Sequence, residues 1–307
     1  MGRYVIRRLL QMIPVFIGTT FLIFMMVWAL PGDPFAGKCG DRPCPESYVQ
    51  AMTAKFNLDE PWYVQYGLYM ANLLQGDFGE TFAGVQVIDE LTQAYPVTFK
   101  LTVIAILFEI VIGVGAGVLT GLRRGGFLDN LVLISTLFVI SIPIFVIGYT
   151  LQLLLGVNLG LFPVTGREGT VYALILPAFV LASATLAYVA RVMRTNLIEN
   201  LRSDYVRTAT AKGLARRRVV GVHTLRNSLI PVITLIGADF GALLGGAIVT
   251  EGIFNINGVG GLIYRSIRLR EFALVTGAVT VLVIVFLLVN LIVDLLYAAL
   301  DPRIRYD

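Results

Sequence analysis

The chain has 307 residues, of which 57% are hydrophobic and only 14% carry a charge, and its mean hydropathy is +0.80. Soluble domains are typically about 45–50% apolar and about 25% charged, so this composition excludes an ordinary soluble domain and indicates helices in lipid. The formal net charge of +4 does not indicate nucleic-acid binding, because the basic residues cluster in short segments between apolar runs.

The first apolar run covers residues 9–30 and follows the basic start MGRYVIRR. A secretory signal peptide is the alternative, but the apolar region of such a peptide is only about 7–15 residues long. No small-residue cleavage site closes the run, which ends in the segment PGDP. We therefore predict an uncleaved first membrane span.

Five more runs are long enough to cross a membrane, for which a helix needs about 20 predominantly apolar residues. The six predicted spans are 9–30, 96–121, 130–155, 171–193, 229–250 and 272–297. These runs are too long and too continuous for the strands of a membrane barrel. The predicted fold class is therefore an all-α integral membrane protein, with one transmembrane domain over residues 1–307.

The loops differ in charge, and this difference predicts the orientation of the chain. Segment 194–228 holds eight basic and two acidic residues, whereas 31–95 holds three basic and nine acidic residues. Because basic loops stay in the cytosol, we expect 194–228 to be cytosolic, 31–95 to be external and both termini to be cytosolic. Loop 251–271 contains three arginines and fits less well, but parity places it outside.

Two cysteines, Cys39 and Cys44, lie in the predicted external loop as CGDRPC. Exported loops meet an oxidising environment in which a disulfide persists, and four intervening residues permit a small ring. We predict a disulfide, and two unpaired thiols remain the alternative. A redox or zinc site of the CxxC type is disfavoured, because the spacing differs and the chain has no further cysteine.

The external loop 31–95 contains an amphipathic stretch, with an aromatic and aliphatic side formed by Trp62, Tyr66, Tyr69, Met70 and Leu73. A helix of this kind lies on the membrane surface or docks an external protein. Ordinary packing also accounts for such a side, so these alternatives stay open.

Glu109 and Asp239 are the acids deepest in the predicted spans. Acids inside a membrane are costly and by default indicate a pathway or a buried partner. These two residues could line a translocation path and meet the ammonium group of a substrate. They could equally pair with Lys100 or with a residue of another subunit.

Glycines recur at four-residue spacing in two spans, at 113, 117 and 121 and again at 237, 241 and 245. Small residues at this spacing let helix backbones approach closely in lipid. Tight packing within one subunit and an interface with another subunit are both consistent with the pattern.

Residues for covalent chemistry are scarce in this chain. It has no G-x-x-x-x-G-K-[ST] phosphate loop, and its single histidine, His223, lies in the basic cytosolic segment. A metal site or a Ser/His protease site is therefore hard to build. We predict no enzyme activity, no cofactor and no metal in this chain, so another subunit or an ion gradient would supply energy for transport.

The cytosolic segment contains a predicted short helix, SDYVRTATAKG, over residues 203–213. Ser203 is a favourable cap, Asp204 suits the first turn, and Gly213 suits the left-handed position that ends a helix. A short helix with small side chains can dock into a groove of a soluble partner. The following basic run 216–218 would contact that partner or anionic lipid, although an ordinary cytosolic loop is the simpler alternative.

Arg207-Thr208-Ala209 and Gly213 occupy the places of a cytosolic motif, EAA followed by three residues and Gly, that marks permease subunits of ABC-type importers. The run TATAKGL and the later HTLRNSLIP are similar to the versions found in peptide importers. The leading Glu is replaced by Arg207, and Pro231 falls later than in the wider consensus. Both departures favour the peptide branch over the amino-acid and sugar branches.

Other motifs follow in the order that this family has. They are Pro31-Gly32-Asp33-Pro34; Leu58-Asp59, Pro61, Gln65-Tyr66 and Gly76-Asp77-Phe78-Gly79; Glu251, Gly258 and Gly260-Gly261; and Val293-Asp294-Leu295-Leu296-Tyr297 with Asp301-Pro302-Arg303-Ile304-Arg305-Tyr306. Along nearly its whole length the chain therefore resembles permease subunits of the peptide/nickel importer family, most closely those for dipeptides and oligopeptides.

The resemblance implies the six-span fold of type I ABC importer permeases, the MetI-like fold, in the cell membrane of a bacterium. It implies four kinds of partner: a second homologous permease, two cytosolic ATPase subunits or domains that bind ATP and Mg²⁺, an external peptide-binding protein, and membrane lipid. The residues expected to couple the chain to the ATPases are Arg207, Thr208, Ala209, Ala211, Lys212, Gly213 and Leu214.

Peptides are the expected cargo, and nickel chelates, glutathione or haem are the alternatives within the same importer class. An ion-coupled secondary transporter is the rival class, but such transporters usually contain inverted repeats, and none is evident here. A scaffold or a membrane enzyme is the remaining rival and lacks a recognisable site.

Overall fold

The computed structural model describes residues 2–29, 35, 38–40, 42–245 and 247–300, with side chains described from residue 5 to residue 295 of these ranges. Within them the chain forms helices and no strand, only one isolated bridge between Glu80 and Gln86. The PGDP motif and the C-terminal DPRIRY motif lie outside the described residues.

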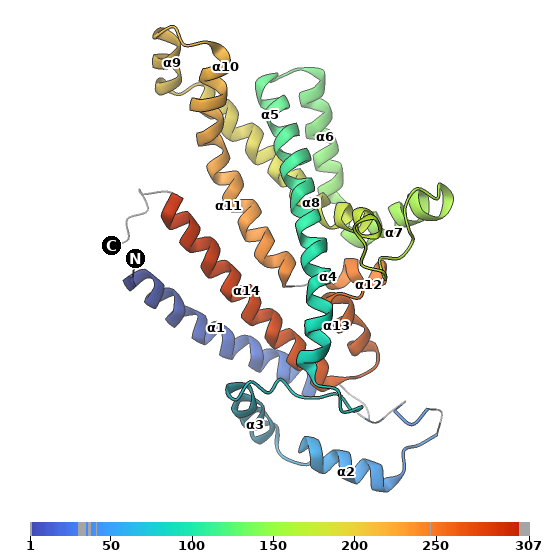
Figure 1. Ribbon diagram of the computed structural model, residues 1–307. Coiled ribbons are helices and arrows are strands. Elements are labelled where there is room, and N and C mark those ends of the chain that lie inside the picture. Colours follow the sequence, from blue (N-terminus) through green and yellow to red (C-terminus); the bar gives the residue numbers. More distant parts are fainter. Residues whose placement is uncertain (1, 30–34, 36–37, 41, 246, 301–307) are drawn as a thin grey trace.

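Long helices account for most of the chain (Figure 1). The long apolar elements are α1 (Gly2–Trp28), α4 (Val87–Phe108) with η1 (Glu109–Val114) and α5 (Gly115–Leu122), α8 (Val171–Leu201), α10 (Arg216–Arg218) with η3 (Val219–Thr224) and α11 (Leu225–Leu244), and α14 (Phe272–Leu300). These five stretches are long and apolar enough to cross a membrane. The elements η1 and η3 are π-helical turns inside otherwise continuous helices.

The predicted third span, 130–155, is not one straight helix. It consists of α6 (Phe127–Ser141) and of α7 (Ile144–Leu151) continued by the π-helical η2 (Gln152–Asn158), and the two parts meet at an angle of 103°. Pro143 precedes α7, and Ile142 before it is extended at φ −99°, ψ 129°. A residue before proline is pushed out of the helical region, which explains the break. The described residues therefore hold six crossings only if this bent pair counts as one.

The predicted fifth span, 229–250, ends earlier than expected. α11 stops at Leu244, and a separate helix, α12 (Ile248–Ile253), follows. Two consecutive glycines, 245 and 246, separate the helices in the sequence, and glycine is a poor helix former. α13 (Val259–Arg268) then leads to α14.

The helix α8 lies at the centre of the bundle, and 67% of the residues in its most apolar stretch of 18 residues are buried. Gly113, Gly117 and Gly121 face α8 so closely that a Cβ atom added at Gly117 would lie 2.5 Å from the Cβ of Met193. The glycines of the second predicted span therefore serve packing within this subunit.

The helices α1 and α14 run side by side at the edge of the bundle (Figure 1). Arg8 of α1 forms an ion pair of 3.0 Å with Asp294 of α14, which brings the two ends of the chain to one side. The short helices α2 (Glu46–Phe56) and α3 (Trp62–Leu74) lie at the end of the bundle opposite α9 (Asp204–Ala211). Cys39 and Cys44, which precede α2, form a disulfide with a Cα–Cα distance of 5.2 Å.

Candidate functional site

The helix α9 stands at the tip of the molecule, between the end of α8 and the start of α10 (Figure 1). Ser203 precedes it in an extended conformation, but its side chain does not cap the helix as predicted. The Ser203 hydroxyl instead donates to the carbonyl of Asn200 at 2.5 Å, since the chain folds back directly from α8. Asp204 occupies the first turn, as the sequence predicts.

The end of α9 is set by Gly213, which has φ +75°. The Gly213 N–H donates to Thr210 at 2.9 Å, and the Leu214 N–H donates to Ala209 at 3.3 Å. This pair of bonds is the Schellman arrangement that stops a helix, and it requires a left-handed residue that only glycine adopts without strain. It also turns Leu214 back onto Val206, Ala209 and Val219 in a small apolar cluster.

The predicted coupling residues do not share one side of α9. Arg207, Thr208, Ala211, Lys212 and Gly213 are exposed, and Leu214 is half-buried. Ala209 is only 7% exposed and packs in the apolar cluster. Ala209 therefore holds the helix against its support, and the exposed residues form the surface that a partner can reach.

A polar link fastens α9 to two of the long helices. The Tyr205 hydroxyl donates to Oδ1 of Asn200 on α8 at 2.8 Å, and Nδ2 of Asn200 donates to Oγ of Ser228 on α11 at 3.1 Å. Ser228 is buried, and its hydroxyl donates to the carbonyl of Thr224 at 2.9 Å. Asn200 therefore connects α9 to both α8 and α11. The sequence gives no periodic signal for this link.

An ion pair fixes α8 to the first turn of α6. Nε and Nη2 of Arg194 donate to Oδ1 and Oδ2 of Asp129 at 2.5 and 2.7 Å, and the Gly125 N–H donates to Oδ2 at 2.8 Å. Two-pronged pairs between arginine and a carboxylate are among the strongest polar contacts. The Asp129 side chain is 2% exposed and the Arg194 side chain 18%, so the pair lies largely inside the bundle, between α6 and α8.

Glu109 and Asp239 are neighbours inside the bundle, and they interact electrostatically. Glu109 is fully buried at the first residue of η1, and Asp239 on α11 is half-buried. Thr185 donates to Oδ1 of Asp239 at 3.1 Å. Among the described residues, both oxygens of Glu109 and Oδ2 of Asp239 have no hydrogen-bond partner.

Pairing of these acids with Lys100, one of the alternatives left open by the sequence, is not found among the described residues. Lys100 is exposed on α4, and no ion pair between it and Glu109 or Asp239 occurs in the described ranges. A buried carboxyl of this kind is either neutral or paired with a group from elsewhere, because unpaired buried charge costs several kcal/mol in a low-dielectric medium.

Glu251 forms a third buried acidic site, on α12 outside the five long helices. It accepts hydrogen bonds from the Thr98 hydroxyl at 3.0 Å and from the Gly261 N–H at 2.9 Å. The Val259 N–H in turn donates to Thr98 at 2.8 Å, so one carboxyl joins α4, α12 and α13. Burial raises the pKa of Glu251 to about 7, against the opposing effect of these donors.

This raised pKa predicts a pH dependence of stability. The folded-state pKa of about 7 exceeds the ordinary value of 4.5. The contribution of Glu251 to the free energy of unfolding is therefore complete below pH 4.5 and is lost as the pH rises through 7. When the pH is lowered from 8 to 6, protonation of Glu251 should raise the free energy of unfolding by about 1.4 kcal/mol. A thermal melt of the purified protein should shift upward by about 3 °C.

Replacing Glu251 by glutamine should remove this part of the pH dependence, while the matched change Glu60→Gln at an exposed acid should keep it. Equal pH profiles for the original chain and Glu251→Gln would contradict the prediction.

The fold and these sites define a multi-pass α-helical membrane protein with an exposed helix at its tip. Residues 113–306 match the family model described as binding-protein-dependent transport system inner membrane component. Residues 1–102 match the model of the N-terminal part of membrane components of such systems. The chain belongs to this family, which confirms the all-α fold class and the resemblance to importer permeases.

Curated relatives match this chain from end to end. It is 35% identical to a dipeptide transport system permease protein of Alkalihalophilus pseudofirmus and 39% identical to a di/tripeptide transport system permease protein of Pseudomonas aeruginosa, with 99% of each chain covered. It is 37% identical to a glutathione transport system permease protein of Escherichia coli, with 100% of both chains covered.

Proposed function

We propose that this chain is the permease subunit of an ATP-driven importer of dipeptides and oligopeptides, and that it forms half of the translocation path. The observation that carries the proposal is α9, a short helix with an exposed side, a glycine stop and a hydrogen-bonded link to α8 and α11. Names of relatives that transport dipeptides, tripeptides and glutathione support the cargo class.

The partners in this proposal follow from its energy source. Two cytosolic ATPase subunits or domains bind ATP and Mg²⁺, and one of them receives α9 in a surface groove. A second homologous permease completes the path, and an external peptide-binding protein delivers the cargo. When the ATPases close, α9 moves with its groove, and the Asn200 link passes this displacement to two spans.

The same proposal orients the chain with α9 and both termini in the cytosol and with α2 and α3 outside. The ion pair between Arg8 and Asp294 supports an even number of crossings, because it joins the two ends of the chain on one side. The excess of basic residues in 194–228 supports the direction.

The direct test is uptake by a deletion strain that carries this chain with its partner subunits. Labelled dipeptides, tripeptides and glutathione are supplied together with nickel and haem as competing cargoes. Peptide uptake should require the ATPases, and it should disappear when their ATP site is inactivated. Uptake that survives without the ATPases would favour an ion-coupled transporter. Uptake of glutathione alone, a tripeptide, would narrow the cargo in line with the relative from Escherichia coli.

We further propose that Asp239 borders the path with Glu109 behind it. Asp239 is the more exposed of the two, and the unpartnered oxygens suit an ammonium group supplied by cargo. Asp239→Asn should lower peptide uptake about tenfold or more, because a hydrogen bond to a charged group contributes about 1.5–3 kcal/mol. ATPase activity stimulated by the binding protein should remain.

Asp294→Asn is the matched control, because Asp294 lies on a different helix, α14, where it is paired with Arg8. Normal uptake in Asp239→Asn would assign the two carboxyls to structure instead of transport.

A further inference from the structure

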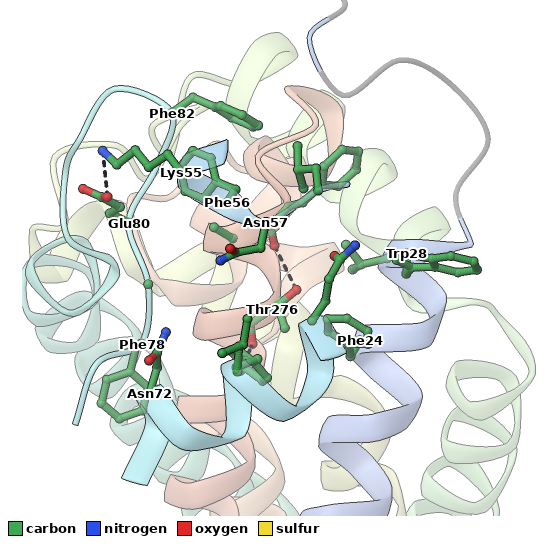
Figure 2. Close-up of a pocket in the computed structure, with 18 residues that line it drawn as sticks. Phe24, Trp28, Lys55, Phe56, Asn57, Asn72, Phe78, Glu80, Phe82 and Thr276 are labelled. Atoms are coloured by element: carbon green, nitrogen blue, oxygen red, sulfur yellow. Dashed lines mark hydrogen bonds and ion pairs between the residues drawn. The ribbon is translucent and has the colours of Figure 1, made fainter. Parts of the chain in front are cut away.

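An open cavity of about 350 Å³ lies where the external helices meet the ends of two spans. Its walls come from the end of α1, the end of α2, α3, the segment 78–82 and the start of α14 (Figure 2). The volume falls within the roughly 300–1,000 Å³ typical of small-molecule sites. None of its walls contains a residue of α9 or the Glu109–Asp239 pair, so the proposed transport function does not use it.

The cavity is mostly aromatic and aliphatic. Phe24 and Trp28 of α1 lie at one side of it, and Phe56 and Phe78 lie at the others (Figure 2). The aromatic side of α3 packs on α1, with ring centroids of Phe24 and Tyr66 5.4 Å apart. Packing therefore accounts for that amphipathic pattern.

The cavity adjoins the exposed apolar surface of α1. Only 6% of the most apolar stretch of α1 is buried within this chain, and Phe24 and Trp28 near the end of that helix line the cavity. Aromatic residues at the ends of spans lie at the level of the lipid headgroups. In the proposed orientation, an acyl chain that lies beside α1 would therefore meet the wall of the cavity at these residues.

Two opposite charges stand at the edge of the cavity (Figure 2). Nζ of Lys55 lies 2.7 Å from Oε1 of Glu80, and both side chains are partly exposed. Among the described lining residues these are the only charged ones, so the cavity is neutral. The amides of Asn57 and Asn72 add further polar groups.

We propose that this cavity binds a zwitterionic phospholipid of the phosphatidylethanolamine class from the outer leaflet. One acyl chain lies against Phe24 and Phe272, the phosphate pairs with Lys55, and the ammonium group pairs with Glu80. A zwitterionic headgroup replaces the ion pair between Lys55 and Glu80 by two ion pairs, one with its phosphate and one with its ammonium group. An anionic headgroup has no ammonium group, so the Glu80 carboxylate would face a phosphate of the same charge. The inference rests on the proposed orientation, in which α2 and α3 are external.

Such a lipid ties α2 and α3 to α1 and α14. The external segment then keeps its position over the span ends through a molecule of the bilayer as well as through protein contacts such as Tyr69 to Thr280, 2.5 Å apart between hydroxyls.

The test uses the full chain with its partner subunits in lipid bilayers. Phosphatidylethanolamine and phosphatidylglycerol, each with the same photoreactive acyl chain, are crosslinked, and the labelled peptides are identified. We expect the label at residues 24–28 and 272–276. Phosphatidylethanolamine should give about tenfold more label than phosphatidylglycerol, because one additional charge-assisted hydrogen bond strengthens binding by about that factor. A photoreactive lipid that is added only to the outer leaflet should be enough to produce this label.

Two variants separate the apolar and the charged parts of the site. Asn72→Trp, at an exposed lining residue, should fill the cavity and remove the label. Glu80→Gln should remove the preference for phosphatidylethanolamine, while Glu60→Gln, in the same external segment but away from the cavity, should keep it.

Three results would overturn the inference: unchanged label in Asn72→Trp, equal or stronger label from phosphatidylglycerol, or displacement of the lipid by a hydrophobic dipeptide, which would mark a peptide site. Label confined to lipid supplied from the cytosolic side would overturn the orientation as well. Labelling does not require ATP, whereas uptake does, so the failure of the lipid site and the failure of the transport function are distinguishable.

Discussion

Peptide uptake is expected to fall to background when Ala209 is replaced by glutamate, while the protein still reaches the membrane. Ala209 is 7% exposed between Val206 and Val219, and a carboxylate placed there has no partner in the described cluster. Burying an unpaired charge costs several kcal/mol, more than this small cluster can supply, so α9 must detach from its support. The long helices do not depend on the cluster, so the bundle remains folded.

The measurement compares uptake, membrane level and ATPase activity. Ala71→Glu is the matched control, because Ala71 is exposed on α3 at the opposite end of the bundle. Gly213→Asp should also abolish uptake, since it adds left-handed strain and places an acid at the helix C-terminus. Gly213→Ala meets no neighbouring atom and should cost only about 1 kcal/mol, with partial uptake. Normal uptake with glutamate at 209 would remove α9 from the mechanism.

Replacing Arg194 by leucine should destabilise the folded chain by about 3–5 kcal/mol, because it leaves the buried Asp129 carboxylate without its cation. The remaining donor, the Gly125 N–H, satisfies only one of the two oxygens. A denaturation curve in mixed micelles gives the free energy, and the amount of chain in the membrane should fall in parallel.

Two further variants decide whether the pair or the single residue matters. The double change Arg194→Leu with Asp129→Leu should recover most of the loss, because no buried charge remains. Arg8→Leu breaks a more exposed pair with Asp294 and should cost about 0–1 kcal/mol. If Arg194→Leu is no worse than Arg8→Leu, the pair between Arg194 and Asp129 does not stabilise the packing of α6 on α8.

Much of the architecture could be predicted because it depends on local sequence. Apolar length gave the long helices, and Gly213 adopts the left-handed conformation that its place after Lys212 predicts. The break at Pro143 was also local, since a residue before proline leaves the helix, but the length of the apolar run 130–155 masked it. The orientation, the coupling contacts and the role of the intramembrane acids stay predictions.

Contacts between distant segments could not be predicted. Arg194 contributes to the basic character of 194–228, yet its partner Asp129 is 65 residues away and is set by how α6 packs on α8. The side of α9 that is buried depends likewise on where Val219 returns, so Ala209 looked like a docking residue. Ser203 has the composition of a helix cap, but the turn from α8 brought the Asn200 carbonyl closer.

The π-helical turn η3, between the arginines of α10 and the apolar α11, has a consequence for inheritance. Such a turn accommodates a single additional residue in a helix that otherwise winds at 3.6 residues per turn. Losing one residue inside η3, for example Gly221, would restore regular winding and leave the angle between α10 and α11 nearly unchanged. Losing one residue from the regular turns of α11 would instead rotate everything before it by about 100°, and α9 would turn away from any partner although no contact residue is altered. A deletion of one codon is therefore tolerated at η3 and harmful inside α11.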